Sequence, residues 1–203
     1  MNRAEAEQLL TWGYEQNPGP WADHCRVVSR AAQTIANKCG LDAERAYILG
    51  LLHDIGYYDY RDYKSRKADH IFTGYELMSD KGYEDVARIC LSHSFTVQDI
   101  ETFASSYVKC TDEQMAFIDA FLRDTVYNDY DRLIQLCDAL GTAQGVVIIE
   151  KRLMDVTRRH GFRDKTIEKW ESNLALKDYF DKLCCMNIYN LFHDEIKTNI
   201  FGG

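Results

Sequence analysis

Proline is confined to one short stretch of this 203-residue chain, and no other sequence feature constrains the fold as strongly. Both prolines, Pro18 and Pro20, lie near the N-terminus, in the turn Asn17-Pro18-Gly19-Pro20. Proline in a helix interior removes a hydrogen bond and clashes with the preceding turn. Its absence after Pro20 permits long helices without proving them, so the spacing of apolar residues must decide.

That spacing is helical over most of the chain. Val27, Ala31 and Ile35 fall on one face of an expected helix, and Gly40 is a typical stop signal after it. The alternation typical of a β-strand is absent over any useful length. The pattern predicts an all-α fold with helices at about 3–16, 21–39, 43–54, 69–80, 83–93, 112–124, 129–143, 145–160 and 164–197, a loop at 57–67, and no clear assignment for 94–111.

Composition narrows the classes of function. The net charge of -8 disfavours stable binding to nucleic acid or to an anionic membrane surface. The seven cysteines include no CxxC pair, which indicates reduced thiols in a cytoplasmic protein. The polar N-terminus does not resemble a signal peptide. We therefore expect a small-molecule ligand and no membrane partner, while the oligomeric state stays open.

An acidic residue ends the most apolar helix. The segment YILGLLHDIG runs a buried helix directly into His53 and Asp54, and no Lys or Arg lies within one turn of the pair. Burying an unpaired carboxylate costs several kcal/mol, so Asp54 needs a partner, and a divalent metal would supply one. The alternative is an exposed Asp54 at the helix C-terminus, where the helix dipole disfavours an acid.

Three more histidines and a second acid lie on inward faces of expected helices. Asp138 falls within the apolar stretch LIQLCDALG, and His24 shares the face of Val27. A single histidine on such a face is usually a core residue bonded to a carbonyl. Several together, on different helices, are what a helical bundle needs to enclose metal. The candidate ligands are His24, His53, Asp54, His70, His93 and Asp138.

The order of these residues resembles the HD superfamily of metal-dependent phosphohydrolases. The resemblance rests on His24, on His53-Asp54 in the context HDIG, and on Asp138. The additional His70 and His93 resemble the six-ligand subset of the superfamily, which binds two metals. The resemblance covers about residues 20–161, including DALGTAQGVVIIEKRLMDV after the last Asp. It implies one helical-bundle domain over 1–203, with an HD core at about 20–161, a short N-terminal helical extension and a C-terminal one at about 162–200.

By this resemblance, two divalent transition metals are the expected cofactors. His24, His53, Asp54 and Asp138 would hold the first ion, and Asp54 would bridge to a second ion held also by His70 and His93. Imidazole and carboxylate ligands suit Fe, Mn, Zn, Co or Ni, with iron the ion we expect. A metal pair can activate water and neutralise phosphate charge. Asp54, His70 and His93 are accordingly the predicted catalytic residues.

The expected loop after HDIG is rich in cations and tyrosines. Arg61, Lys64 and Lys67 are the predicted substrate-binding residues, because cations at such positions bind phosphate oxygens. The loop tyrosines offer faces for stacking on a base. The alternative is a solvated loop whose aspartates balance the cations. Tyr57 stands where many HDIG proteins carry a Lys.

Other polar residues near the set receive simpler interpretations. Asp69 and Asp23 adjoin candidate ligands and could orient them. Arg152, Arg158 and Arg159 are interpreted as surface charges on their helix, and His160 and His193 as ordinary surface or capping histidines.

The leading hypothesis is hydrolysis of a phosphate ester or anhydride in a nucleotide or other small phosphorylated molecule. The main alternative is an oxygenase that uses a mixed-valent di-iron centre on the same six ligands, as in the branch that includes inositol oxygenase. A third is a regulatory nucleotide-binding HD domain, against which the intact ligand set argues.

Overall fold

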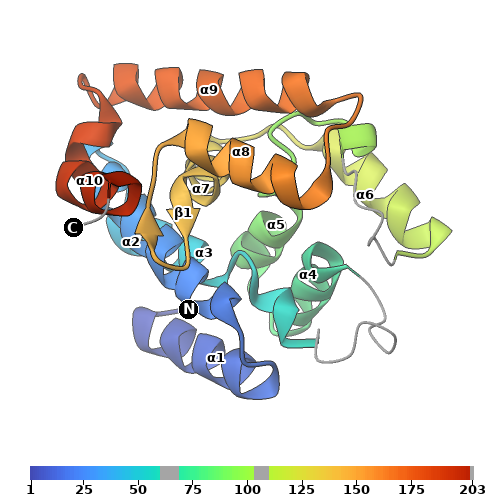
Figure 1. The fold of residues 1–203 in the computed structure, drawn as a ribbon. Helices are drawn as coiled ribbons and strands as arrows, with labels where there is room; N and C mark the ends of the chain where they lie inside the picture. Colours follow the sequence, from blue (N-terminus) through green and yellow to red (C-terminus); the bar gives the residue numbers. More distant parts are fainter. Residues whose placement is uncertain (60–68, 103–109, 202–203) are drawn as a thin grey trace.

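The computed structural model describes residues 1–59, 69–102 and 110–201, and over these ranges it confirms the all-α prediction (Figure 1). The α-helices are α1 (Arg3–Gln16), α2 (Pro20–Cys39), α3 (Ala43–Leu52), α4 (His70–Asp80), α5 (Glu84–Ser92), α6 (Asp112–Asp124), α7 (Asp129–Leu140), α8 (Ile149–His160), α9 (Thr166–Leu183) and α10 (His193–Phe201). Three 3-10 segments, η1 (Ile55–Asp59), η2 (Ile100–Thr102) and η3 (Ile188–Phe192), and the paired strands β1 (Gly141–Thr142) and β2 (Gly145–Val146) complete these ranges.

The helix ends follow from local sequence. Pro20 occupies the first turn of α2, where its missing N–H is not needed, and Gly40 ends the helix with a φ of 78°. The side chain of Asp42 caps α3 by accepting from the backbone N–H of Arg45. Asn128 starts α7 in a capping box. These short-range signals fix where the helices that carry the candidate ligands begin.

The core forms where α2 packs against α3 and α7. Gly50 allows the first contact to be close, because a Cβ there would lie 2.9 Å from the Cα of Ser29. The same core includes Phe180 of α9 and Ile188 of η3, so the C-terminal helices bury apolar side chains against the central ones. The division of the chain into a core and two extensions stays a prediction.

Two predicted helices were wrong at their ends. The expected helix 164–197 ends at Leu183, because Cys185 adopts a φ of 53° and the chain then turns through η3 into α10. The expected helix 145–160 begins only at Ile149, since the preceding residues form the small hairpin with β1. Both errors involve tertiary or turn geometry that apolar periodicity does not record.

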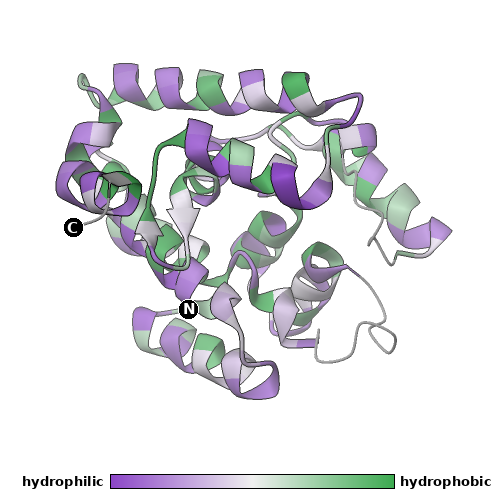
Figure 2. Cartoon of the chain, in the orientation of Figure 1, coloured by the Kyte–Doolittle hydropathy of each residue, from purple (hydrophilic) through white to green (hydrophobic). Residues whose placement is uncertain are grey.

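In space, α9 runs along one side of the bundle with α8 and α7 beneath it, and α1 lies at the opposite side (Figure 1). Green apolar segments face inward and purple hydrophilic ones outward on most helices, whereas the last turn of α8 is uniformly hydrophilic (Figure 2). None of the helices in the described ranges is both long and apolar enough to cross a membrane.

Candidate metal centre

All six candidate ligands meet at one place in the bundle. They come from α2 (His24), the turn after α3 (His53 and Asp54), the first residue of α4 (His70), the residue after α5 (His93) and the last turn of α7 (Asp138). All but His70 and Asp138 are buried, and those two are half-buried. Helices distant in sequence therefore converge on one polar cluster inside an apolar core.

Asp54 lies at the centre of this cluster, and its two oxygens face different histidines. Its Oδ1 is 3.2 Å from Nε2 of His70 and 3.3 Å from Nε2 of His93. Its Oδ2 is 3.5 Å from Nε2 of His53 and 3.8 Å from Nε2 of His24. The carboxylate thus joins two pairs of imidazoles, one on each oxygen.

Asp138 belongs to the half of the cluster that contains His24. Its Oδ1 lies 3.0 Å from Nε2 of His24. One donor atom from each of His24, His53 and Asp138 lies within 4.8 Å of the others, and the same holds for Asp54, His70 and His93. The six side chains therefore form two adjoining groups of three, each with the nitrogen and oxygen donors that divalent transition metals accept.

The second nitrogen of three imidazoles is held in place by a hydrogen bond. His53 Nδ1 donates to the carbonyl of Gly50 at 2.7 Å, and His93 Nδ1 donates to the carbonyl of Ile89 at 3.1 Å. His70 Nδ1 lies 2.7 Å from Oδ1 of Asp69. These contacts turn each Nε2 toward Asp54 and fix the ring orientation, as in metal sites whose histidines bond to a carbonyl or carboxylate behind them.

Mutual charge stabilises the carboxylates in their ionised form. Burial opposes ionisation of Asp54, but His53 and His70 outweigh it and hold its pKa well below the usual range. Burial likewise opposes ionisation of Asp138, and its hydrogen bond to His24 overcomes that effect and lowers the pKa. Burial lowers the pKa of His53 to about 4, so this imidazole is neutral at physiological pH. Anionic oxygens and a neutral imidazole are the states that bind metal.

Two buried nitrogens show that the cluster is incomplete as a hydrogen-bond network. Within the described ranges, neither Nδ1 of His24 nor Nε2 of His53 has a hydrogen-bond partner, and Nε2 of His53 is the one that faces Asp54. An orphaned nitrogen of this kind is expensive in a protein interior unless a ligand completes it. Cys25 also lies against His53 and Asp54, but burial raises the pKa of its thiol well above the usual value, so it is a neutral neighbour.

Two cavities open onto the cluster. The first, which we call the lysine cavity, has a volume of about 530 Å³ and includes His70, His93, Asp138, Arg152, Lys169 and Trp170 in its wall. The second, which we call the arginine cavity, has a volume of about 870 Å³ and includes His24, Asp54, Arg152, Arg158, Arg159 and Gln144. Tyr57 and Arg152 line both cavities, and each cavity includes candidate ligands in its wall.

Tyr57 lies against the cluster itself. Its ring stacks on that of His70, with centroids 4.3 Å apart and an angle of 13° between the planes. It also belongs to the walls of both cavities. Tyr57, which stands where many HDIG proteins carry a lysine, therefore packs against one candidate ligand and lines both cavities.

The predicted substrate-binding residues Arg61, Lys64 and Lys67 lie outside the described residues. Of the two acids expected to orient ligands, Asp69 does contact His70, whereas Asp23 pairs with Arg26 on the surface. His193 is 71% exposed, as expected of a surface residue.

Arg158, Arg159 and His160 are exposed, as expected of surface residues, and Arg152 is half-buried. These residues also line cavities beside the cluster. Arg152, Arg158 and Arg159 of α8 line the arginine cavity, and His160 lines the lysine cavity. No functional role was predicted from the sequence for Lys169 and Trp170 of α9, which line the lysine cavity. No spacing in the sequence links α9 to Asp138, because only the packing of α9 on α7 brings them together.

Comparison with known proteins identifies the central part of the chain. The family model described as HD domain matches residues 21–143, which is more than half of the chain and contains all six candidate ligands. No curated protein and no solved structure matches the chain. The family match and the His/Asp cluster agree with the order of residues His24, His53-Asp54 and Asp138. The chain belongs to the HD domain superfamily of metal-dependent phosphohydrolases.

Proposed function

We propose that this protein is a metal-dependent phosphohydrolase that acts on a small phosphorylated molecule, with nucleotides the first class to test. The observation that carries the proposal is the arrangement around Asp54. Its two oxygens face two separate pairs of histidines, and one of these pairs, His70 and His93, lines a cavity that also contains cations. A bridging carboxylate beside a cationic cavity suits phosphate chemistry.

In this proposal the six side chains hold two divalent ions. His24, His53 and Asp138 would hold one ion, His70 and His93 would hold the other, and Asp54 would contribute to both. The donor set fits such ions because the orphaned Nε2 of His53 and the ionised carboxylates need a cation. Once bound, the ions supply an activated water and neutralise charge on the attacked phosphate.

Two cations that line the lysine cavity, Lys169 and Arg152, bind the phosphate. Lys169 is half-buried, and no carboxylate of a described residue pairs with its ammonium group. Burial lowers the pKa of Lys169, and Asp138 partly offsets this effect. Arg152 lies 3.7 Å from Oδ1 of Asp138, at the limit of an ion pair. Both cations are therefore placed to bind phosphate oxygens beside the cluster.

The rest of the lysine cavity suits an organic group. Leu153 and Val156 of α8 and Trp170 of α9 give it an apolar wall. Its volume of about 530 Å³ falls in the range of small-molecule sites. An indole face stacks on a base or packs on a sugar, so the cavity accommodates the non-phosphate part of such a substrate.

The test is hydrolysis with and without oxygen. Metal-loaded protein is incubated with mononucleotides, dinucleoside polyphosphates and sugar phosphates in air and under argon, with Asp54→Ala protein in parallel to exclude contaminating phosphatase. Equal release of phosphate or nucleotide in both atmospheres, absent from the variant, supports the proposal. Turnover that requires oxygen and consumes it in proportion to product contradicts it and supports an oxygenase.

A further inference from the structure

The arginine cavity is a second site that the reaction at the cluster does not by itself require. It reaches His24 and Asp54, which do not line the lysine cavity, and the two cavities share Tyr57 and Arg152. A ligand held at the cluster can therefore extend in two directions. One leads toward Trp170 and Lys169, and the other toward the last turns of α8.

Positive charge gathers in the arginine cavity without a matching number of acids. Its wall has three arginines and two acids, Asp54 and Asp155; Asp54 faces the histidines of the cluster, and Asp155 pairs with Lys151 at 3.0 Å. Arg159 donates to the backbone carbonyl of Asp155 at 3.3 Å, and within the described residues neither it nor Arg158 forms an ion pair. This concentration of cations occurs in a chain whose net charge is -8.

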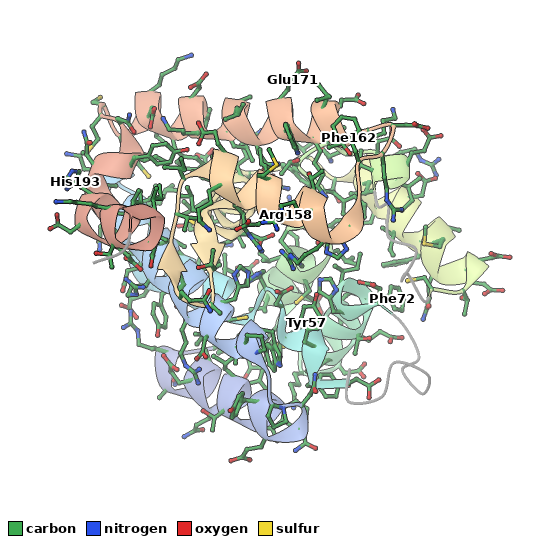
Figure 3. The ribbon with its side chains drawn as sticks, in the orientation of Figure 1. Tyr57, Phe72, Arg158, Phe162, Glu171 and His193 are labelled. Atoms are coloured by element: carbon green, nitrogen blue, oxygen red, sulfur yellow. The ribbon has the colours of Figure 1, made fainter. Side chains whose placement is uncertain are left out.

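The arginines also lie close enough to repel one another. Burial lowers the pKa of Arg159, and the charge of Arg152 lowers it further. Figure 2 shows the last turn of α8 as its most hydrophilic part, and in Figure 3 Arg158 lies on this helix with Tyr57 below it. Like charges held together at the mouth of a site lose repulsion when an anion binds between them.

Phosphate is the anion that this arrangement fits best. Guanidinium groups bind phosphate oxygens through paired hydrogen bonds, and several together favour a group with more than one negative charge. When the cluster holds the phosphate that is attacked, the arginine cavity is free to hold a neighbouring phosphate of the same substrate. The organic part of the substrate then occupies the lysine cavity, which has the apolar wall.

We infer that the arginine cavity binds a second phosphate of the substrate, so that the substrate is a phosphoric anhydride rather than a simple monoester. This inference rests on the proposed phosphohydrolase function and specifies its substrate class. Hydrolysis of an anhydride breaks one P–O bond of a P–O–P linkage and adds one water, so that each product ends in a P–OH group that then ionises. Arg158 and Arg159 determine specificity by contacting the phosphate that is not attacked.

The experiment compares two probes that the enzyme cannot hydrolyse. Methylphosphonate carries one phosphorus group and methylenediphosphonate carries two, and their dissociation constants for the metal-loaded protein are measured by calorimetry, with metal content checked afterwards. We expect wild-type protein to bind the diphosphonate at least tenfold more tightly. In Arg158→Gln/Arg159→Gln protein this preference should fall below twofold, while Arg123→Gln protein should keep it.

Arg123 is a suitable control because it is 66% exposed, lies on α6 and pairs with Asp119. Equal affinities for the two probes in wild-type protein, or a preference that survives the double substitution, would overturn the inference. If the double variant does not fold, Arg158→Gln alone is used, and the preference should fall at least threefold. Diphosphonate preference without any hydrolysis would contradict the proposed function alone, and monoester hydrolysis without that preference would contradict this inference alone.

Discussion

The backbone carbonyl of His70 packs directly against the α-carbon of Gly56, so that η1 and the first turn of α4 touch with no side chain between them. A Cβ at position 56 would collide with this carbonyl oxygen and would lie 2.6 Å from the amide nitrogen of Gly74. Both neighbours are backbone atoms and cannot rotate away. The glycine of the HDIG motif thus positions a candidate ligand that lies fourteen residues further along the chain.

The first prediction is that Gly56→Ala displaces α4 and removes His70 from the cluster. We expect the variant to lose one of two bound ions, because the group formed by Asp54, His70 and His93 is opened. Elemental analysis of the folded protein measures this loss. Gly40→Ala is the control, since its φ of 78° also makes alanine unfavourable but nothing lies within 4 Å of the added Cβ. Metal content that is equal in the two variants would contradict the prediction.

A second prediction concerns Asp131, which ties α5 to α7 beside the cluster. Asp131 is fully buried and accepts from Nη2 of Arg88 at 2.6 Å and from Oγ of Ser92 at 2.9 Å. Asp131→Ala leaves these donors without their acceptor, which should lower the free energy of unfolding by about 3 kcal/mol. Urea denaturation followed by circular dichroism measures the change.

Asp119→Ala is the matched control for that experiment. Asp119 also pairs with an arginine, Arg123, but the pair is solvent-exposed and lies within one helix. Such pairs contribute less than about 1 kcal/mol. Similar losses of stability in the two variants would show that the buried pair does not hold α5 and α7 together.

The structure brings together the six candidate ligands that the sequence placed on inward helix faces, and two of them, Asp54 and Asp138, lie next to strong local signals. Asp54 follows an apolar helix that has no nearby cation, and Asp138 lies within a stretch of buried residues of α7. A buried acid needs a partner, and this physical requirement can be read from sequence alone. Short-range signals also mark the starts of α2, α3 and α4, where a proline or a capping aspartate begins the helix.

The cavities could not be predicted in that way. Lys169 lies on α9 and Arg158 on α8, both beyond the family match, and their sequence neighbours resemble those of any surface helix. They line the cavities beside the cluster because α8 and α9 both pack against α7, which carries Asp138. Tertiary packing therefore decides which surface cations become part of the site.

A third prediction is that Lys169 binds the phosphate in the lysine cavity. Lys169→Met keeps the length of the side chain but removes its charge, and we expect the dissociation constant for inorganic phosphate to rise about tenfold, as for loss of one charged hydrogen bond. Calorimetry on metal-loaded protein measures it. Lys177→Met is the control on the same helix, because Lys177 pairs with Asp181 at 2.5 Å. An unchanged constant in Lys169→Met protein would exclude this role.

A fourth prediction separates the two halves of the cluster. His70→Ala removes a nitrogen from one half and leaves His24, His53 and Asp138 in place. We expect this variant to bind one ion per chain where wild-type protein binds two, and to lose phosphate release. Titration with Mn²⁺ followed by electron paramagnetic resonance counts the ions. Retention of two ions would show that His70 is no ligand, whereas one ion in both proteins would support a mononuclear site.

The most direct test of the account is the metal content of Asp54→Ala protein. Asp54 is the only residue of the described cluster whose oxygens face both pairs of histidines, at 3.2 to 3.8 Å. Wild-type, Asp54→Ala and His193→Ala proteins are saturated with the same divalent ion, passed over a desalting column and subjected to elemental analysis. The account predicts two ions per chain in wild-type and His193→Ala protein and none in Asp54→Ala protein. Two ions retained in Asp54→Ala protein would contradict it.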